Sequence, residues 1–112
     1  MPYDEALAAR LRTLLAAEPD LTERRMFGGL GFMLAGTMAV AAASTGGLLL
    51  RVPPGETTEI LAEAGTEPMV MRGRATTGWV LVTPDACRTD ADLARWVAVG
   101  VATARAIGPK TG

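Results

Sequence analysis

The sequence has 112 residues, of which 49% are hydrophobic, and this suffices for one domain whose core needs no disulfide or metal ion. Eleven basic and twelve acidic residues give a net charge of -1, which excludes a strong overall attraction to nucleic acid or anionic lipid. The apolar runs are far shorter than the roughly 18 to 20 residues that span a bilayer, and the acidic N-terminus does not resemble a secretory signal. With Cys87 as the only cysteine, we expect a cytoplasmic protein without membrane association.

A helix is predicted at the N-terminus, from Asp4 to Glu18. Four leucines recur at the spacing of one helix face: Leu7, Leu11, Leu14 and Leu15. Pro19 disfavours helical angles in the residue before it, so the helix is expected to end there. The leucine pattern indicates that this helix covers the core.

Strands and turns are predicted from Arg24 onward, because glycines become too frequent for a helix. The expected strands are Leu30–Leu34, Thr37–Ala43 and Leu48–Val52. The first two would form a hairpin about Ala35 and Gly36. Alanine is a poor first residue for a tight turn with positive φ, which favours a looser, bulged turn.

Both faces of this sheet are expected to be largely apolar. Alternation along the second strand puts Met38, Val40 and Ala42 on one face and Thr37, Ala39, Ala41 and Ala43 on the other. Helices can cover one face, so we expect another chain to cover the second. The six methionines suit an adaptable contact surface, although any single one can equally fill an ordinary core.

The second half of the chain is predicted to contain two helices and two strands. These are a short helix Glu56–Ala64 closed by Gly65, strands Pro68–Met71 and Thr77–Thr83, and a helix from a capping box of Thr89 and Asp92 to Gly108. The predicted fold class is α+β, a two-layer sandwich of an antiparallel sheet packed by about three helices. Its order is α-β-β-β-α-β-β-α, with three or four strands before the second helix. We expect one domain over 1–108 and a short tail over 109–112.

The residue inventory argues against catalysis. Histidine is absent, which removes the commonest general base near neutral pH and the commonest metal ligand, and one cysteine makes neither a zinc site nor a redox pair. Cys87 is interpreted as a small structural residue rather than an exposed thiol. Glu56, Glu59 and Glu63 are interpreted as a solvated helix face. We therefore expect no enzyme activity, no metal and no cofactor.

Two other features could bind a ligand. The glycines at 28, 29 and 31 could suggest a phosphate loop, but they lead into a hairpin instead of opening a helix, so a strand bend or close backbone packing is favoured. Five arginines could converge into a basic patch: Arg24, Arg25, Arg51, Arg72 and Arg74. Because no aromatic residues interleave with them, solvated arginines are favoured over nucleic-acid binding.

The glycine-rich block from Met26 to Met33, together with later residues, resembles the N-terminal domain of the TfoX/Sxy competence-regulator family. The signature residues are Met26, Phe27, Gly28, Gly29, Gly31, Gly36, Gly78 and Trp79. The resemblance covers nearly the whole chain, and Ala35 departs from it where the family usually has asparagine. It implies a two-layer α+β sandwich similar to small secretion-chaperone-like domains, with no catalytic residues and a structural role for the signature.

The resemblance also implies a partner. The founding regulators of the family are transcriptional coactivators of DNA-uptake genes that act with the cyclic-AMP receptor protein and carry a second, helical domain. We expect a protein-binding module with a transcription factor as partner, and a homodimer as a further alternative. Direct nucleic-acid binding through the arginines and a small-molecule or catalytic site are the less favoured alternatives.

Overall fold

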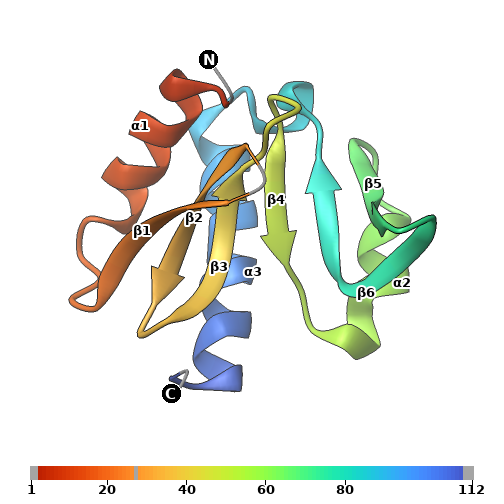
Figure 1. Ribbon diagram of the computed structural model, residues 1–112. Helices are drawn as coiled ribbons and strands as arrows, with labels where there is room; N and C mark the ends of the chain where they lie inside the picture. The colour runs from red at the N-terminus through yellow and green to blue at the C-terminus, as the bar shows by residue number, and fades with distance from the viewer. Residues whose placement is uncertain (1–2, 27, 110–112) are drawn as a thin grey trace.

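The computed structural model describes residues 3–26 and 28–109 of the chain, and its elements follow one another around a single sheet (Figure 1). Phe27 and the tail residues 110–112, which belong to our predicted signature and tail, lie outside the described residues. The strands are β1 (Leu21–Met26), β2 (Gly29–Leu34), β3 (Thr37–Ala42), β4 (Leu48–Arg51), β5 (Thr66–Met71) and β6 (Arg74–Val82). The helices are α1 (Glu5–Leu15), α2 (Thr57–Leu61) and α3 (Asp90–Ile107), with 3-10 turns at Pro54–Glu56 and Pro84–Cys87.

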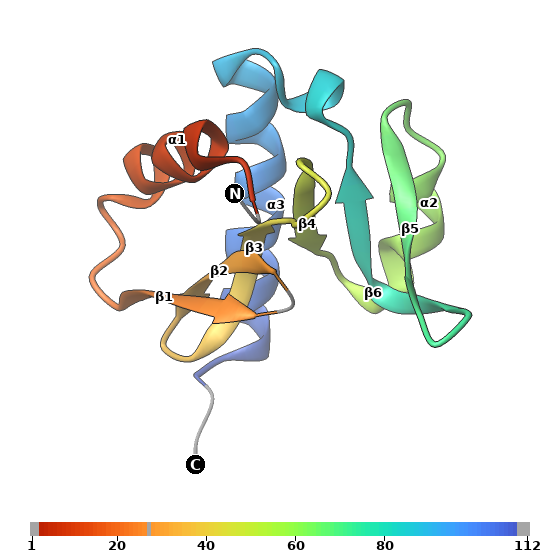
Figure 2. The same ribbon diagram turned by 45° about the horizontal axis from the view of Figure 1, so that its top comes forward.

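All neighbouring strands are antiparallel, in the spatial order β1-β2-β3-β4-β6-β5. In Figure 1, α3 and α2 lie behind the strands, and Figure 2 shows α1 on the same side as α3. The helices therefore form one layer and the sheet the other. This confirms the predicted α+β sandwich.

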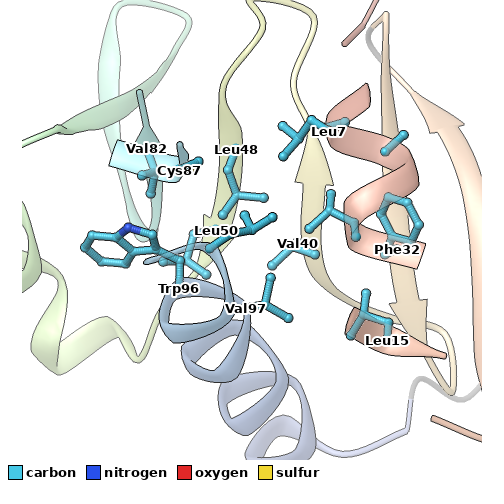
Figure 3. Packing of buried hydrophobic residues seen from close by; sticks show 14 of the residues in the cluster. Leu7, Leu15, Phe32, Val40, Leu48, Leu50, Val82, Cys87, Trp96 and Val97 are labelled. Atoms are coloured by element: carbon cyan, nitrogen blue, oxygen red, sulfur yellow. The ribbon is translucent and has the colours of Figure 1, made fainter. Parts of the chain in front are cut away.

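The main core lies between these layers, where side chains of α1 and α3 meet one face of the sheet (Figure 3). Ile60 and Leu61 of α2 pack against this cluster. Phe32 of the sheet lies beside α1, Val40 and Leu50 lie over α3, and these three residues and Trp96 of α3 are all 2% exposed or less. Burying one such side chain stabilises the fold by about 1.5 to 3 kcal/mol. The indole Nε1 of Trp96 donates to the Ala86 carbonyl at 3.2 Å, so the buried ring leaves no polar atom unsatisfied.

The helix ends follow the sequence signals closely. The Asp4 carboxylate accepts from the backbone N–H groups of Ala6 and Leu7, and the Thr89 hydroxyl accepts from the backbone N–H of Asp92 at 3.1 Å. Gly108 ends α3 with φ of 89°. In α1, three of the four predicted leucines are buried, but Leu14 is 38% exposed and turns away from the core.

The sequence left the number of strands before α2 open and overestimated the length of α2. Leu21–Met26 forms a fourth strand before α2, within the range of three or four that we predicted. Its side chains are polar and mostly exposed because β1 is an edge strand, so the pattern carries little strand signal. The helix expected over Glu56–Ala64 is shorter, since its first turn is 3-10 and regular α-helix occupies only Thr57–Leu61.

The hairpin between β2 and β3 corrects two further predictions. The turn is tight, because Leu34 pairs with Thr37 and both central residues have positive φ, 51° at Ala35 and 85° at Gly36. The bulge lies inside β3 instead, where the pairing passes from Met38 to Val40 and leaves Ala39 unpaired. The expected alternation was therefore wrong: Met38 leaves the Val40 face and joins the opposite face of the sheet.

Candidate protein-interaction face

The face of the sheet that points away from the helices carries its own apolar cluster. We call it the open face, and it is the face toward the viewer in Figure 1. Its cluster consists of Met33, Met38 and Ala41, with Met26, Leu49 and Trp79 packed against them. These side chains come from five of the six strands, all except the edge strand β5, so the cluster runs across most of the sheet.

Two hollows lie on the open face, and Met26 lines both of them. The first has a volume of about 330 Å³ and is lined mainly by apolar residues, including Ala41, Leu49, Leu81 and Val70. The second has a volume of about 400 Å³ and is lined by Arg24, Met33, Met38, Arg51, Trp79 and Ile107 among others. Because one methionine borders both, the two hollows are adjacent parts of one surface.

The glycine block creates this surface by close packing. A Cβ at Gly29 would lie 2.6 Å from the Ala42 carbonyl oxygen, and one at Gly31 would lie 2.8 Å from the Cε of Met38. The close packing that we gave as one of two interpretations of these glycines is thus confirmed. Gly28 supplies a φ of 77° in the β1–β2 turn.

The later signature residues also have structural roles. Gly36 completes the tight turn between β2 and β3, and Gly78 has a φ of 91°, which disfavours any other residue. The Gly78 N–H donates to the Thr57 hydroxyl at 3.0 Å, which ties β6 to α2. Trp79 differs from these glycines because its ring lies on the open face.

Arg51 is the best-positioned charged group of the open face. Its Nε donates to the Met38 carbonyl at 2.8 Å, and its guanidinium lies 4.1 Å from the ring centroid of Trp79. The side chain is half-buried, and this burial lowers the pKa of the Arg51 guanidinium below its usual value. Across residues 3–26 and 28–109, no carboxylate lies within ion-pair distance of it.

The five candidate arginines do not all come together. Arg24 and Arg51 line the second hollow. Arg25 follows Arg24 directly in β1, so its side chain points to the opposite side of the strand, toward the helices. Arg72 and Arg74 lie at the β5–β6 turn, near the other edge of the sheet. The structure thus gathers two of the five predicted residues into one site.

The register across the sheet explains what sequence reasoning missed at this site. Leu49 and Leu81 line the first hollow, but they lie in continuous apolar runs whose alternation cannot be read from the sequence. Arg51 meets Trp79 because β4 pairs with β6, two strands that are separated by a helix and another strand. A local pattern carries no signal for such a pairing.

The groups that could carry chemistry elsewhere are dispersed. Cys87 is 2% exposed in the main core, and burial raises the pKa of its thiol to about 11, which agrees with the predicted structural role. Glu56, Glu59 and Glu63 are exposed as expected, and Glu63 pairs with Arg95 of α3. Among the described residues, no three histidine, cysteine, aspartate or glutamate side chains cluster as a metal site would require.

The fold and the open face define the chain as a two-layer α+β domain with a helix-covered face and an apolar, uncovered face. A family model described as the TfoX N-terminal domain matches residues 13–104, and the chain belongs to this family. No curated protein and no solved structure matches the chain. In the part of the chain that the structure describes, no helix is long and apolar enough to cross a membrane.

Proposed function

We propose that this domain is a non-enzymatic protein-binding module that uses the open face to bind a partner. The observation that carries the proposal is the apolar cluster of Met33, Met38 and Ala41 with its two adjacent hollows, on a face that no helix of the described residues covers. The three central residues of this cluster are only 4 to 8% exposed, so the surface offered to a partner is the lining of the two hollows. Apolar hollows of this kind are typical of binding sites.

The residues around the hollows support a contact with another protein. Val70 at the edge of the first hollow is 55% exposed, and Ile107 at the edge of the second is 54% exposed. Methionines line both hollows, and their unbranched side chains adapt to a partner's shape with little strain. A partner that covers this face would remove both exposed residues from water and gain the free energy of their burial.

The family suggests the setting of this binding. TfoX proteins are linked to competence regulation, and membership of their N-terminal domain family makes an accessory role in transcriptional regulation the natural proposal. In this role the partner would be a transcription factor. A homodimer is the alternative protein partner.

Partner binding is tested by substitutions at the edges of the hollows. Val70→Asp places a charge at the edge of the first hollow, and Ile107→Asp places one at the end of α3, where it borders the second hollow. Both positions are exposed, so the domain should still fold, and both variants should abolish co-purification of the native partner. Leu14→Asp is the matched control, because Leu14 is also an exposed apolar residue but lies on α1. Partner capture that survives both open-face variants would contradict the proposal, and light scattering on the purified domain would reveal a homodimer.

Direct nucleic-acid binding is the second candidate function. It is favoured by one observation, that none of the five candidate arginines pairs with a carboxylate within residues 3–26 and 28–109. It predicts a gel shift that weakens steeply as salt rises. A lack of any shift at low salt would contradict this candidate.

A further inference from the structure

We propose that the open face recognises a partner segment in which an acidic side chain is flanked by apolar ones, with the carboxylate bound by Arg51 and Arg24. This inference rests on the proposed function and specifies the chemistry of its partner. The apolar side chains would occupy the two hollows.

The side chain of Arg51 is held in a fixed geometry. The Nε bond to the Met38 carbonyl and the contact with the Trp79 ring hold the guanidinium plane in one orientation. Only one of its five N–H donors has a hydrogen-bond partner among the described residues. The remaining donors form the fork that matches a carboxylate, and ordering this fork in advance lowers the entropy lost on binding.

The positive charge of Arg51 lies in surroundings that hydrate it poorly. Arg51 is half-buried beside methionines and the indole ring, so it has lost part of its hydration, and it has no carboxylate partner among residues 3–26 and 28–109. Arg24 lines the same hollow and adds a second positive charge. An anion bound between them would be stabilised both by hydrogen bonds and by the reduced local dielectric.

Apolar side chains surround the two arginines. The second hollow combines the two arginines with Met33, Met38 and Ile107, and the first hollow next to it is apolar. A ligand that fits both must carry apolar groups around its anion. A nucleic-acid backbone fits less well, because the guanidinium of Arg51 already lies over the Trp79 ring that a base would stack on.

A second copy of the chain is also a poor occupant of this face. In a dimer with twofold symmetry, an interface centred here would bring Arg51 and Arg24 against the same residues of the other copy. Like charges facing one another in a desolvated interface cost free energy. The charge of the face therefore points to a different protein with an acidic segment.

The inference is tested by selecting random displayed peptides on the intact domain and measuring the affinity of those recovered. We expect peptides with aspartate or glutamate between apolar residues. Replacing that acid by its amide, or Arg51 by glutamine (Arg51→Gln), should weaken binding at least about tenfold, as expected for loss of a charge-assisted bidentate contact. Circular dichroism would show that Arg51→Gln still folds.

A pair of exposed variants on one strand provides the matched control. Arg24→Gln should weaken the acidic peptides about threefold, while Arg25→Gln makes the same charge change on the opposite side of β1 and should have no effect. Equal losses in both variants would show a general charge effect and overturn the inference.

The remaining outcomes separate the inference from the function on which it rests. If the recovered peptides are apolar without an acid, bind Arg51→Gln normally and fail on Ile107→Asp, the acidic ligand is wrong but the open face still binds protein. If no peptide is enriched, or if all peptides bind Arg51→Gln and Ile107→Asp as they bind the wild type, the acidic ligand and protein binding by the open face are both wrong. A DNA oligonucleotide that displaces the peptides at low salt would overturn the inference in favour of nucleic-acid binding.

Discussion

The helical layer and the open face of the sheet treat their arginines differently. Arginines of α1, α3 and the turn before α3 each have a carboxylate partner: Arg10, Arg12, Arg88, Arg95 and Arg105. Arg51 on the open face instead contacts a carbonyl and an aromatic ring. The helical layer satisfies its charges within the chain, whereas the open face retains a positive charge among apolar side chains.

This difference indicates which face of the sheet stabilises the domain. Exposed ion pairs contribute little each, so the helical layer gains its stability from the buried core beneath them. The open face has exposed apolar groups and an uncompensated charge, which reduce stability and suit a surface that is completed by binding.

The largest effect is expected from neighbouring leucines of β4 that point to opposite faces. Leu50 is fully buried beneath α3, and Leu50→Ala should lower the free energy of unfolding by about 3 to 4 kcal/mol. Leu49 lies half-buried on the open face, and Leu49→Ala should cost about 1 kcal/mol. Urea unfolding of both variants measures the difference, and equal losses would mean that the open face is as well packed as the core.

Two glycine-to-alanine substitutions compare the packing of the same two faces by adding one methyl group to each. A Cβ at Gly100 in α3 would lie 2.6 Å from the Ala39 carbonyl oxygen and 2.8 Å from a methyl group of Val40. Since the carbonyl cannot move away without shifting β3, Gly100→Ala should destabilise the domain by about 2 kcal/mol. Gly31→Ala would meet the flexible tip of Met38, which can rotate aside toward the hollow, so we expect a loss below about 1 kcal/mol.

Thermal melting of the two alanine variants tests this comparison. Gly55→Ala serves as the control, because its Cβ would meet no atom within 4 Å and its φ is not positive. The division between the faces would be wrong if Gly31→Ala destabilised the domain more than Gly100→Ala.

A smaller, stabilising effect is expected at the turn that joins β2 and β3. Ala35 has a φ of 51°, a conformation that glycine adopts without strain, so Ala35→Gly should raise the free energy of unfolding by about 0.5 to 1 kcal/mol. Asparagine also tolerates this conformation, so Ala35→Asn should have the same sign. Chemical denaturation measures the gain, and a loss in both variants would show that the alanine methyl group packs usefully.

The same hairpin shows how far the sequence predicts the fold. Leucine spacing, capping residues and glycine stops predict α1, α3 and most strands, because these signals act over a few residues. The sequence could not predict the bulge at Ala39, since whether a residue is paired depends on a neighbouring strand. The bulge moves Met38 to the open face, so the place of this residue in the candidate site depended on a tertiary feature.

The arginine site illustrates the same limit. The sequence suggested that five arginines could form a basic patch, but it could not tell which of them share one site. Arg24 and Arg51 line the same hollow although two strands lie between β1 and β4 in the sheet. Trp79 joins them only through the pairing of β4 with β6.

The smallest effect concerns the charges of the helical layer and depends on pH. Hydrogen bonds from Arg105 lower the pKa of Asp20 below its ordinary value of 3.8, and hydrogen bonds from Arg12 lower the pKa of Glu23 below 4.5. Because both pKa values are lower in the folded state, these groups contribute stability above their unfolded pKa values. That contribution is lost as the pH falls through their folded pKa values.

We therefore expect the melting temperature to be flat near neutral pH and to decline from about pH 4.5 downward. Asp20→Asn should remove part of this decline while changing the neutral melting temperature little, because the pair is exposed and screened by salt. Glu67→Gln on β5 is the matched control, since Glu67 is exposed and forms no ion pair within residues 3–26 and 28–109. An identical acid decline in wild type and Asp20→Asn would show that the Arg105 contact does not couple to folding, and the open face would then not differ from the helical layer in this respect.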